Sequence, residues 1–73
     1  MKKSYQNMGG NSGVAFYEAG PDYIEVWFQG SPRSYRYSYG KAGSANVETM
    51  KALAQDGKGL NSFINRNVKF LYD

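Results

Sequence analysis

The chain has 73 residues, nine of them Lys or Arg and six Asp or Glu, so its formal net charge is +3. This length leaves room for one small domain, whose large apolar side chains all have to serve a single core. The sequence contains no Cys and no His. Their absence excludes disulfides and thiolate metal sites, and it removes the commonest general base and zinc ligand. We therefore expect a folded, non-enzymatic domain without a cofactor.

The beginning of the chain is predicted to lie outside the fold. Residues 1–13 are rich in Asn, Gln, Ser and Gly and offer little to bury, so we expect a flexible tail followed by one domain over residues 14–73. The first ten residues carry positive charge but lack the apolar run of a secretion signal. No stretch approaches the roughly 18 apolar residues of a membrane span. We expect a cytoplasmic protein with no membrane partner.

Three segments rich in β-branched and aromatic residues follow, over residues 14–17, 23–28 and 35–39. Short connections separate them, and each connection contains Gly and Pro, which are typical of tight turns. The segments predict a three-stranded antiparallel meander. The first strand leaves two alternatives open: a four-residue loop sends Ala15 and Tyr17 to the core, and a loop one residue longer or shorter sends Val14 and Phe16 there.

After residue 44 the spacing of apolar residues changes from two to about 3.6, which predicts a helix over residues 45–56. Ser44 or Asn46 is placed to cap its start, and Gly57 to end it. A second, shorter helix is predicted from the apolar residues Leu60, Phe63 and Ile64. The fold class is thus α+β, with both helices packed on one face of the sheet. Residues 68–72 fit either a last short strand or an extended segment on the sheet edge.

The pairing of the second and third strands can be argued from side-chain direction. Ile24, Val26 and Phe28 alternate with more polar positions, so they should face the helices. A four-residue loop over residues 30–33 then places Trp27 opposite Arg36 on the outer face. The opposite parity would bury a guanidinium without a partner, which is costly.

This outer face carries the functional hypothesis. Trp27 beside Arg36 could stack unpaired bases and neutralise phosphates. The predicted interface consists of two stacking residues, Trp27 and Tyr23, and five cations, Arg33, Arg36, Lys41, Lys58 and Arg66. The predicted partner is RNA or single-stranded nucleic acid. A simpler interpretation is a surface cation–π pair in a domain whose charges only keep it soluble.

The same aromatic face could dock on another protein or on a second copy of the chain, because an exposed apolar patch is often a contact surface. Catalysis by paired carboxylates is not indicated, since the six Asp and Glu lie at strand ends, in turns and on a helix's polar face. The sequence therefore predicts a binding module and not an enzyme.

The order of these segments also resembles a known family. The features that carry the resemblance are Tyr17, the run 24–28, the triplet Tyr35-Arg36-Tyr37, Leu53-Ala54, Gly57, Gly59 and the run Asn61-Ser62-Phe63-Ile64. Together, from Tyr17 to Arg66, they resemble the KTSC domain, named for a C-terminal segment of some lysyl-tRNA synthetases. The family has no established activity. Its synthetase context implies RNA as a partner.

Overall fold

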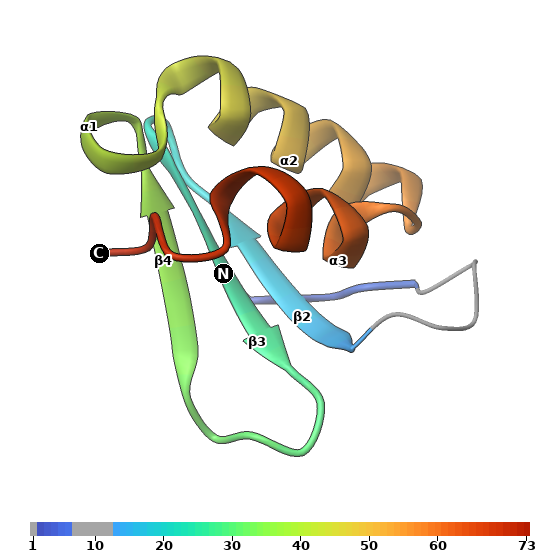
Figure 1. Cartoon of the computed structure of the whole chain (residues 1–73). Helices are drawn as coiled ribbons and strands as arrows, with labels where there is room; N and C mark the ends of the chain where they lie inside the picture. Colours follow the sequence, from blue (N-terminus) through green and yellow to red (C-terminus); the bar gives the residue numbers. More distant parts are fainter. Residues whose placement is uncertain (1, 7–12) are drawn as a thin grey trace.

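The structure, a computed structural model, describes residues 2–6 and 13–73. One antiparallel sheet has the strand order β1-β2-β3-β4, and the helices lie together on one face of it (Figure 1). The strands are β1 (Lys3–Ser4), β2 (Val14–Ala19), β3 (Tyr23–Phe28) and β4 (Ser34–Ser38). The helices are α1 (Tyr39–Ala42), α2 (Ser44–Asp56), α3 (Leu60–Phe63) and the π-helical turn η1 (Ile64–Val68). The predicted α+β class is confirmed, with one more strand than the three that we expected.

The predicted meander is formed by β2, β3 and β4, whose β-branched and aromatic residues favour extended backbone. At the turn between β2 and β3, the N–H of Gly20 donates to the carbonyl of Tyr23 over 2.9 Å. Position 20 needs glycine, because a Cβ there would lie 2.0 Å from the ring of Tyr23. The turn between β3 and β4 contains Gly30 at φ 78°. Glycine adopts this positive φ readily, whereas residues with a side chain rarely do.

Strand β1 was not predicted. It pairs antiparallel with β2, and the N–H of Tyr5 extends the pairing by donating to the carbonyl of Ala15 over 2.9 Å. The ring of Tyr5 is buried, and its hydroxyl accepts a hydrogen bond from the N–H of Leu60 over 3.3 Å. The flexible tail predicted for residues 1–13 is therefore wrong for β1 and Tyr5. Residues 7–12 lie outside the described part of the chain.

A β-bulge in β2 decides between the two alternatives for that strand. The register shifts between Val14 and Phe16, so Ala15 is an extra residue in the ladder. As a result Val14 and Tyr17 are both buried, and Phe16 lies on the opposite face. Each alternative is right for one end of the strand, because the bulge changes the parity between them.

The register of β3 and β4 differs from the predicted one by two residues. Trp27 pairs with Ser34 and Glu25 pairs with Arg36, so Trp27 and Arg36 are not directly opposite as we expected. The connection between the two strands spans residues 29–33, one residue more than the predicted loop over residues 30–33. A shift of two keeps the parity, and Trp27 and Arg36 do share the outer face.

The predicted helix over residues 45–56 is confirmed as α2. Its buried residues are Val47, Met50 and Ala54. It ends at Gly57, which has φ 79° and donates its N–H to two carbonyls of the last turn. The predicted capping by Ser44 or Asn46 is wrong, since Gly43 precedes the helix and no side chain caps it. The short helix α1, between β4 and α2, was not predicted.

The second predicted helix is α3 together with η1, which buries Leu60, Ile64 and Val68 against the sheet. The residues after η1 do not form a strand. They run along β4, where the N–H of Asp73 donates to the carbonyl of Arg36 over 2.7 Å. Neither alternative holds over all of residues 68–72, because Val68 ends η1 and residues 69–70 form a turn, and only the last residues run extended along the sheet edge.

Candidate nucleic-acid interface

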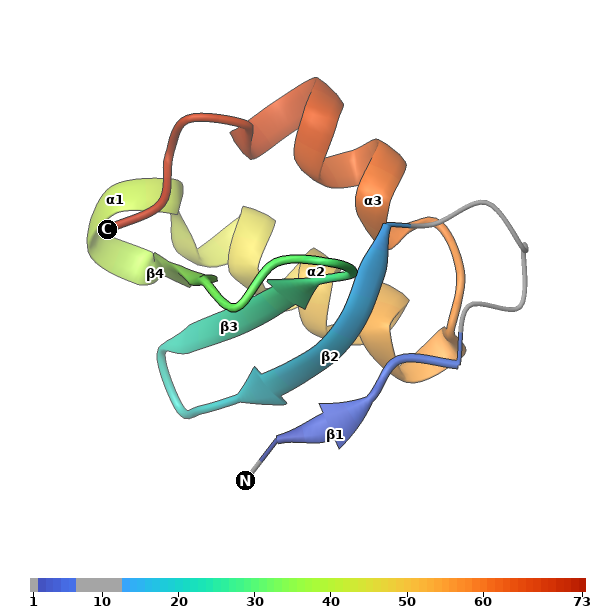
Figure 2. The ribbon, with the colours of Figure 1, turned by 90° about the horizontal axis from the view of Figure 1, so that it is seen from below.

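The strands present two faces of different kind. The inner face lies under α2, α3 and η1, whereas no helix covers the outer face (Figure 2). The outward-pointing residues of β2, β3 and β4 define what we call the outer face. They are Phe16, Glu18, Tyr23, Glu25, Trp27, Ser34 and Arg36.

Trp27 lies at the centre of an aromatic and cationic cluster. Its cross-strand neighbour is Phe16, which is 37% exposed. The ammonium of Lys2 lies 4.6 Å from the ring centroid of Phe16 and 5.2 Å from that of Trp27. Trp27 itself is half-buried. The cluster therefore combines two ring surfaces with one cation at a distance typical of cation–π contact.

Arg36 forms a second cluster with Tyr23 and Glu25. Its guanidinium lies 4.2 Å from the ring centroid of Tyr23 and donates to the carboxylate of Glu25 over 3.1 Å. This hydrogen bond raises the pKa of Arg36 above its ordinary value. The arginine side chain is still 49% exposed. Arg36 is therefore accessible, but part of its charge is already balanced by its own neighbour.

Carboxylates reduce the positive charge of the outer face. The hydroxyl of Tyr23 donates to Glu18 over 2.7 Å, and this bond lowers the pKa of Glu18 and raises the pKa of Tyr23. The hydroxyl of Ser34 donates to Glu25. Glu18 is thus held in the charged form by a donor on the same face, and Glu25 accepts hydrogen bonds from two residues of that face, Ser34 and Arg36.

The other predicted cations are spread over the molecule. Arg33 is exposed in the turn before β4, with its guanidinium 5.5 Å from the ring centroid of Tyr35. Lys41 belongs to α1, Lys58 lies in the turn after α2, and Arg66 belongs to η1. These last three belong to the helical part and do not join Trp27. The structure therefore places Trp27, Tyr23 and Arg36 on one face, with Trp27 in one cluster and Tyr23 and Arg36 in the other, and it does not bring the whole predicted set together.

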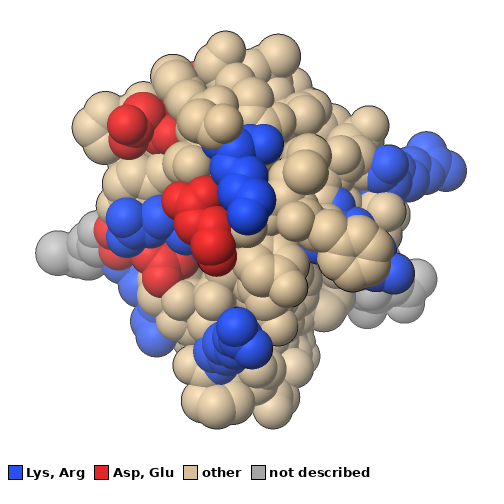
Figure 3. Space-filling view, turned by 60° about the vertical axis from the view of Figure 1, so that its left-hand side comes forward, with Lys and Arg blue, Asp and Glu red and all other residues tan. Residues whose placement is uncertain are grey.

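The surface view agrees with this distribution. Seen from the side of β4, acidic and basic side chains lie next to each other in the middle of the view, and the remaining basic side chains lie apart from them (Figure 3). No continuous basic surface is visible on this side of the described residues. Long-range attraction of a polyanion to this side would therefore be weak.

Two residues of the cluster were absent from the predicted interface, Phe16 and Lys2. Phe16 was missed because the parity of the first strand could not be fixed without the bulge. Lys2 was missed because nothing in the sequence pairs the residues near it with the sheet. The one available signal was Tyr5, a large aromatic residue in an otherwise polar segment.

Metal sites and membrane-spanning helices are both absent from residues 2–6 and 13–73. Among these residues, no group of three or more Asp, Glu, His or Cys could hold a metal ion. None of the described helices is long and apolar enough to cross a membrane. No protein-family model, no curated protein and no solved structure matches the chain.

Proposed function

We propose that this chain is a non-enzymatic binding module, acting in the cytoplasm, that holds unpaired nucleic acid on the outer face of its sheet. The observation that carries the proposal is the cluster of Phe16 and Trp27 with the ammonium of Lys2 within 5.2 Å of both rings. Bases stack on exposed aromatic rings, and each stack contributes roughly 1–3 kcal/mol. A cation beside the rings is placed to contact the phosphate of a stacked nucleotide. The resemblance to the KTSC domain, with its implied RNA context, points to the same partner.

The roles divide between the two clusters. Trp27 is the main stacking residue, with Phe16 beside it. Tyr23 is a weaker platform, because Arg36 lies closer over its ring, at 4.2 Å, than Lys2 lies over the ring of Trp27, at 5.2 Å. Lys2 and Arg36 are the cations on this face and would contact phosphates, whereas Arg33 lies against Tyr35 of the inner face. Lys41, Lys58 and Arg66 would add only long-range attraction.

This division predicts a modest dependence on salt. For single strands, log affinity falls by about 0.7 per log unit of salt for each phosphate neutralised. Two contacts therefore give a slope of about −1.4, whereas engagement of all five predicted cations would give about −3.5. The slope thus distinguishes binding on the outer face from binding over the whole surface.

The experiment is a titration of the full chain with fluorescein-labelled ten-nucleotide oligouridine, followed by anisotropy at two salt concentrations. Trp27→Ala should weaken binding by about tenfold or more, the equivalent of one stacked base. Lys2→Met keeps a long side chain but removes the charge, so the salt slope should become less steep by about 0.7. Lys58→Met is the matched control and should change little.

Two results would count against the proposal. One is no binding at low salt. The other is an equal effect of Lys58→Met and Lys2→Met, which would mean that only overall charge matters. The same titration with oligodeoxyuridine tells whether the 2′-hydroxyl contributes, because this DNA strand has the same bases and lacks the hydroxyl.

The second candidate is a protein-interaction module that uses the same face, with a second copy of the chain as one partner. It is favoured by the ion pair of Arg36 with Glu25 and by the negative charge of Glu18, which leave these strand residues of the outer face without an excess of positive charge. Trp27 is the one tryptophan of the sequence, so burial of its indole in a dimer would shift its emission as protein concentration rises. Light scattering over the same concentrations would show the change in mass.

A further inference from the structure

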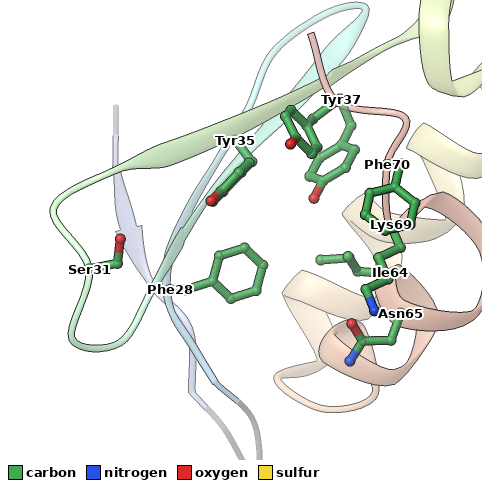
Figure 4. Close-up of a pocket in the computed structure, with 9 residues that line it drawn as sticks. Phe28, Ser31, Tyr35, Tyr37, Ile64, Asn65, Lys69 and Phe70 are labelled. Carbon is green, nitrogen blue, oxygen red and sulfur yellow. The ribbon is translucent and has the colours of Figure 1, made fainter.

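A pocket lies on the other side of the sheet, between the inner face of β3 and β4 and the C-terminal part of the chain (Figure 4). Its volume is about 310 Å³, at the lower end of the range of small-molecule sites. Tyr35 and Tyr37 reach into it from β4, and Ile64, Asn65 and Lys69 face them (Figure 4). The pocket shares none of the residues of the outer face.

Aromatic rings form the wall on the sheet side. Tyr35 packs edge to face with Phe28 at 5.6 Å between centroids and with Tyr72 at 4.7 Å. Tyr72 also meets Tyr37 edge to face at 6.3 Å. Such rings offer both edges and faces to a further ring, which is the arrangement that aromatic groups prefer. The wall therefore suits a flat aromatic ligand.

The same tyrosines supply hydroxyl groups that protein atoms leave unused. Within the described part of the chain, the hydroxyls of Tyr35, Tyr37 and Tyr72 make no hydrogen bond, and no buried side-chain N or O atom lacks a partner. The hydroxyl of Tyr37 must therefore retain a little contact with the pocket, although the residue is only 1% exposed. Burial raises the pKa of Tyr37 to about 12, so the hydroxyl is a hydrogen-bond donor at neutral pH.

The opposite wall carries positive charge. Lys69 and the amide of Asn65 lie next to each other on it (Figure 4). Neither Asp nor Glu is among the residues that line the pocket. Among the described residues, Lys69 forms no ion pair, and its ammonium lies 5.4 Å from the ring centroid of Phe70. The pocket therefore complements an anion and would repel a cation.

We propose that this pocket binds a small aromatic carboxylate. The aromatic part would lie against Phe28, Tyr35 and Tyr72, and the carboxylate would accept hydrogen bonds from Lys69 and a tyrosine hydroxyl. A carboxylate suits these partners, because charge-assisted hydrogen bonds to an anion are the strongest of their kind. The proposal is independent of the nucleic-acid function, since the two sites lie on opposite faces of the sheet.

The test is a titration of the full chain with 2-naphthoate, followed residue by residue in amide NMR spectra. Resonances of Tyr35, Asn65, Lys69 and Tyr72 should move, and those of Phe16 and Trp27 should not. The neutral analogue 2-naphthamide has the same shape without the charge, so it should bind about five- to tenfold more weakly.

Lys69→Met should weaken the binding of 2-naphthoate by the same factor and leave the affinity for 2-naphthamide unchanged. Lys58→Met is the matched control, because its lysine lies outside the pocket, and it should bind both probes as the unaltered chain does. Tyr35→Phe removes one hydroxyl and keeps the ring wall, so it tests the donor without disturbing the fold. The proposal is overturned if the pocket resonances stay in place, if only the outer face responds, or if naphthamide binds as tightly as naphthoate.

Discussion

The inner and outer faces of the sheet are built by alternate residues of the same three strands, yet different interactions hold them. On the inner face, Val14, Ile24 and Val26 are completely buried, and removal of apolar surface from water supplies the stability. On the outer face, polar and charged side chains pair with one another and remain partly exposed. Burial thus determines the fold, whereas the outer face is free to carry a function at little cost in stability.

Truncation on each face gives the largest expected contrast. Ile24→Ala leaves a cavity in the core and should lower the free energy of unfolding by about 3 kcal/mol. Phe16→Ala, on the adjacent strand but 37% exposed, should lower it by about 1 kcal/mol or less. Urea denaturation measures both. Equal losses would contradict the assignment of stability to the inner face.

A domain of this size is expected to have a total stability of only about 5 kcal/mol. The loss expected for Ile24→Ala is therefore a large part of the stability that keeps the chain folded. Ile24→Val removes one methyl group and should cost about 1 kcal/mol. It keeps the comparison measurable if the alanine variant does not fold.

The inner face also contains a tyrosine whose titration can be measured. The pKa of Tyr37 is raised from 10 to about 12 by burial. The neutral form is thus favoured in the folded state, and its contribution to stability is complete below pH 10 and is lost as the pH rises to about 12. Over that interval the free energy of unfolding should fall by about 1.4 kcal/mol per pH unit from this group alone.

Tyr37→Phe is the control for this alkaline effect, because it keeps the ring and removes the ionisable hydroxyl. The variant should lose less stability than the unaltered chain between pH 10 and pH 12, as measured by urea denaturation at each pH. Identical slopes for the two chains would show that Tyr37 is not held in the neutral form by its surroundings.

The contrast between the faces also explains how far the sequence could predict the structure. The strands over β3 and β4, the helix α2 and the outward direction of Trp27 follow from local patterns of apolar and polar residues, and they are correct. The register of Trp27 against Arg36 depended on the length of one loop. The connection spans residues 29–33 and not the predicted 30–33, because an alternating pattern of residues does not show where a turn begins.

The candidate site was harder to predict than the fold because it depends on contacts between distant segments. Lys2 lies close to Trp27 because β1 pairs with β2. The pocket under β4 exists because Tyr72 and Lys69 fold back onto the sheet. Neither contact has a sequence signature, whereas the periodicity of a strand or a helix does.

On the outer face, the contribution of Tyr23 to stability should depend on pH in the acidic range. The hydrogen bond from Tyr23 lowers the pKa of Glu18 below its ordinary value of 4.5. This bond stabilises the folded chain above that pH, and its contribution is lost as the pH falls through the lowered pKa. Tyr23→Phe should therefore be slightly less stable at pH 7 and equally stable at pH 2. A difference that persists at pH 2 would contradict this origin.

The smallest expected change in stability should accompany a gain in binding. Glu25→Gln removes the exposed ion pair with Arg36, and such pairs contribute about 0.2–1 kcal/mol. The amide of glutamine can still accept the hydrogen bond from Ser34, so the fold should change little. Without the carboxylate, however, the guanidinium of Arg36 is available to phosphate. Oligouridine should then bind more tightly and its salt slope should become steeper, both measured by anisotropy. Weaker binding would mean that the carboxylate of Glu25 positions Arg36 for the nucleic acid and does not compete with it.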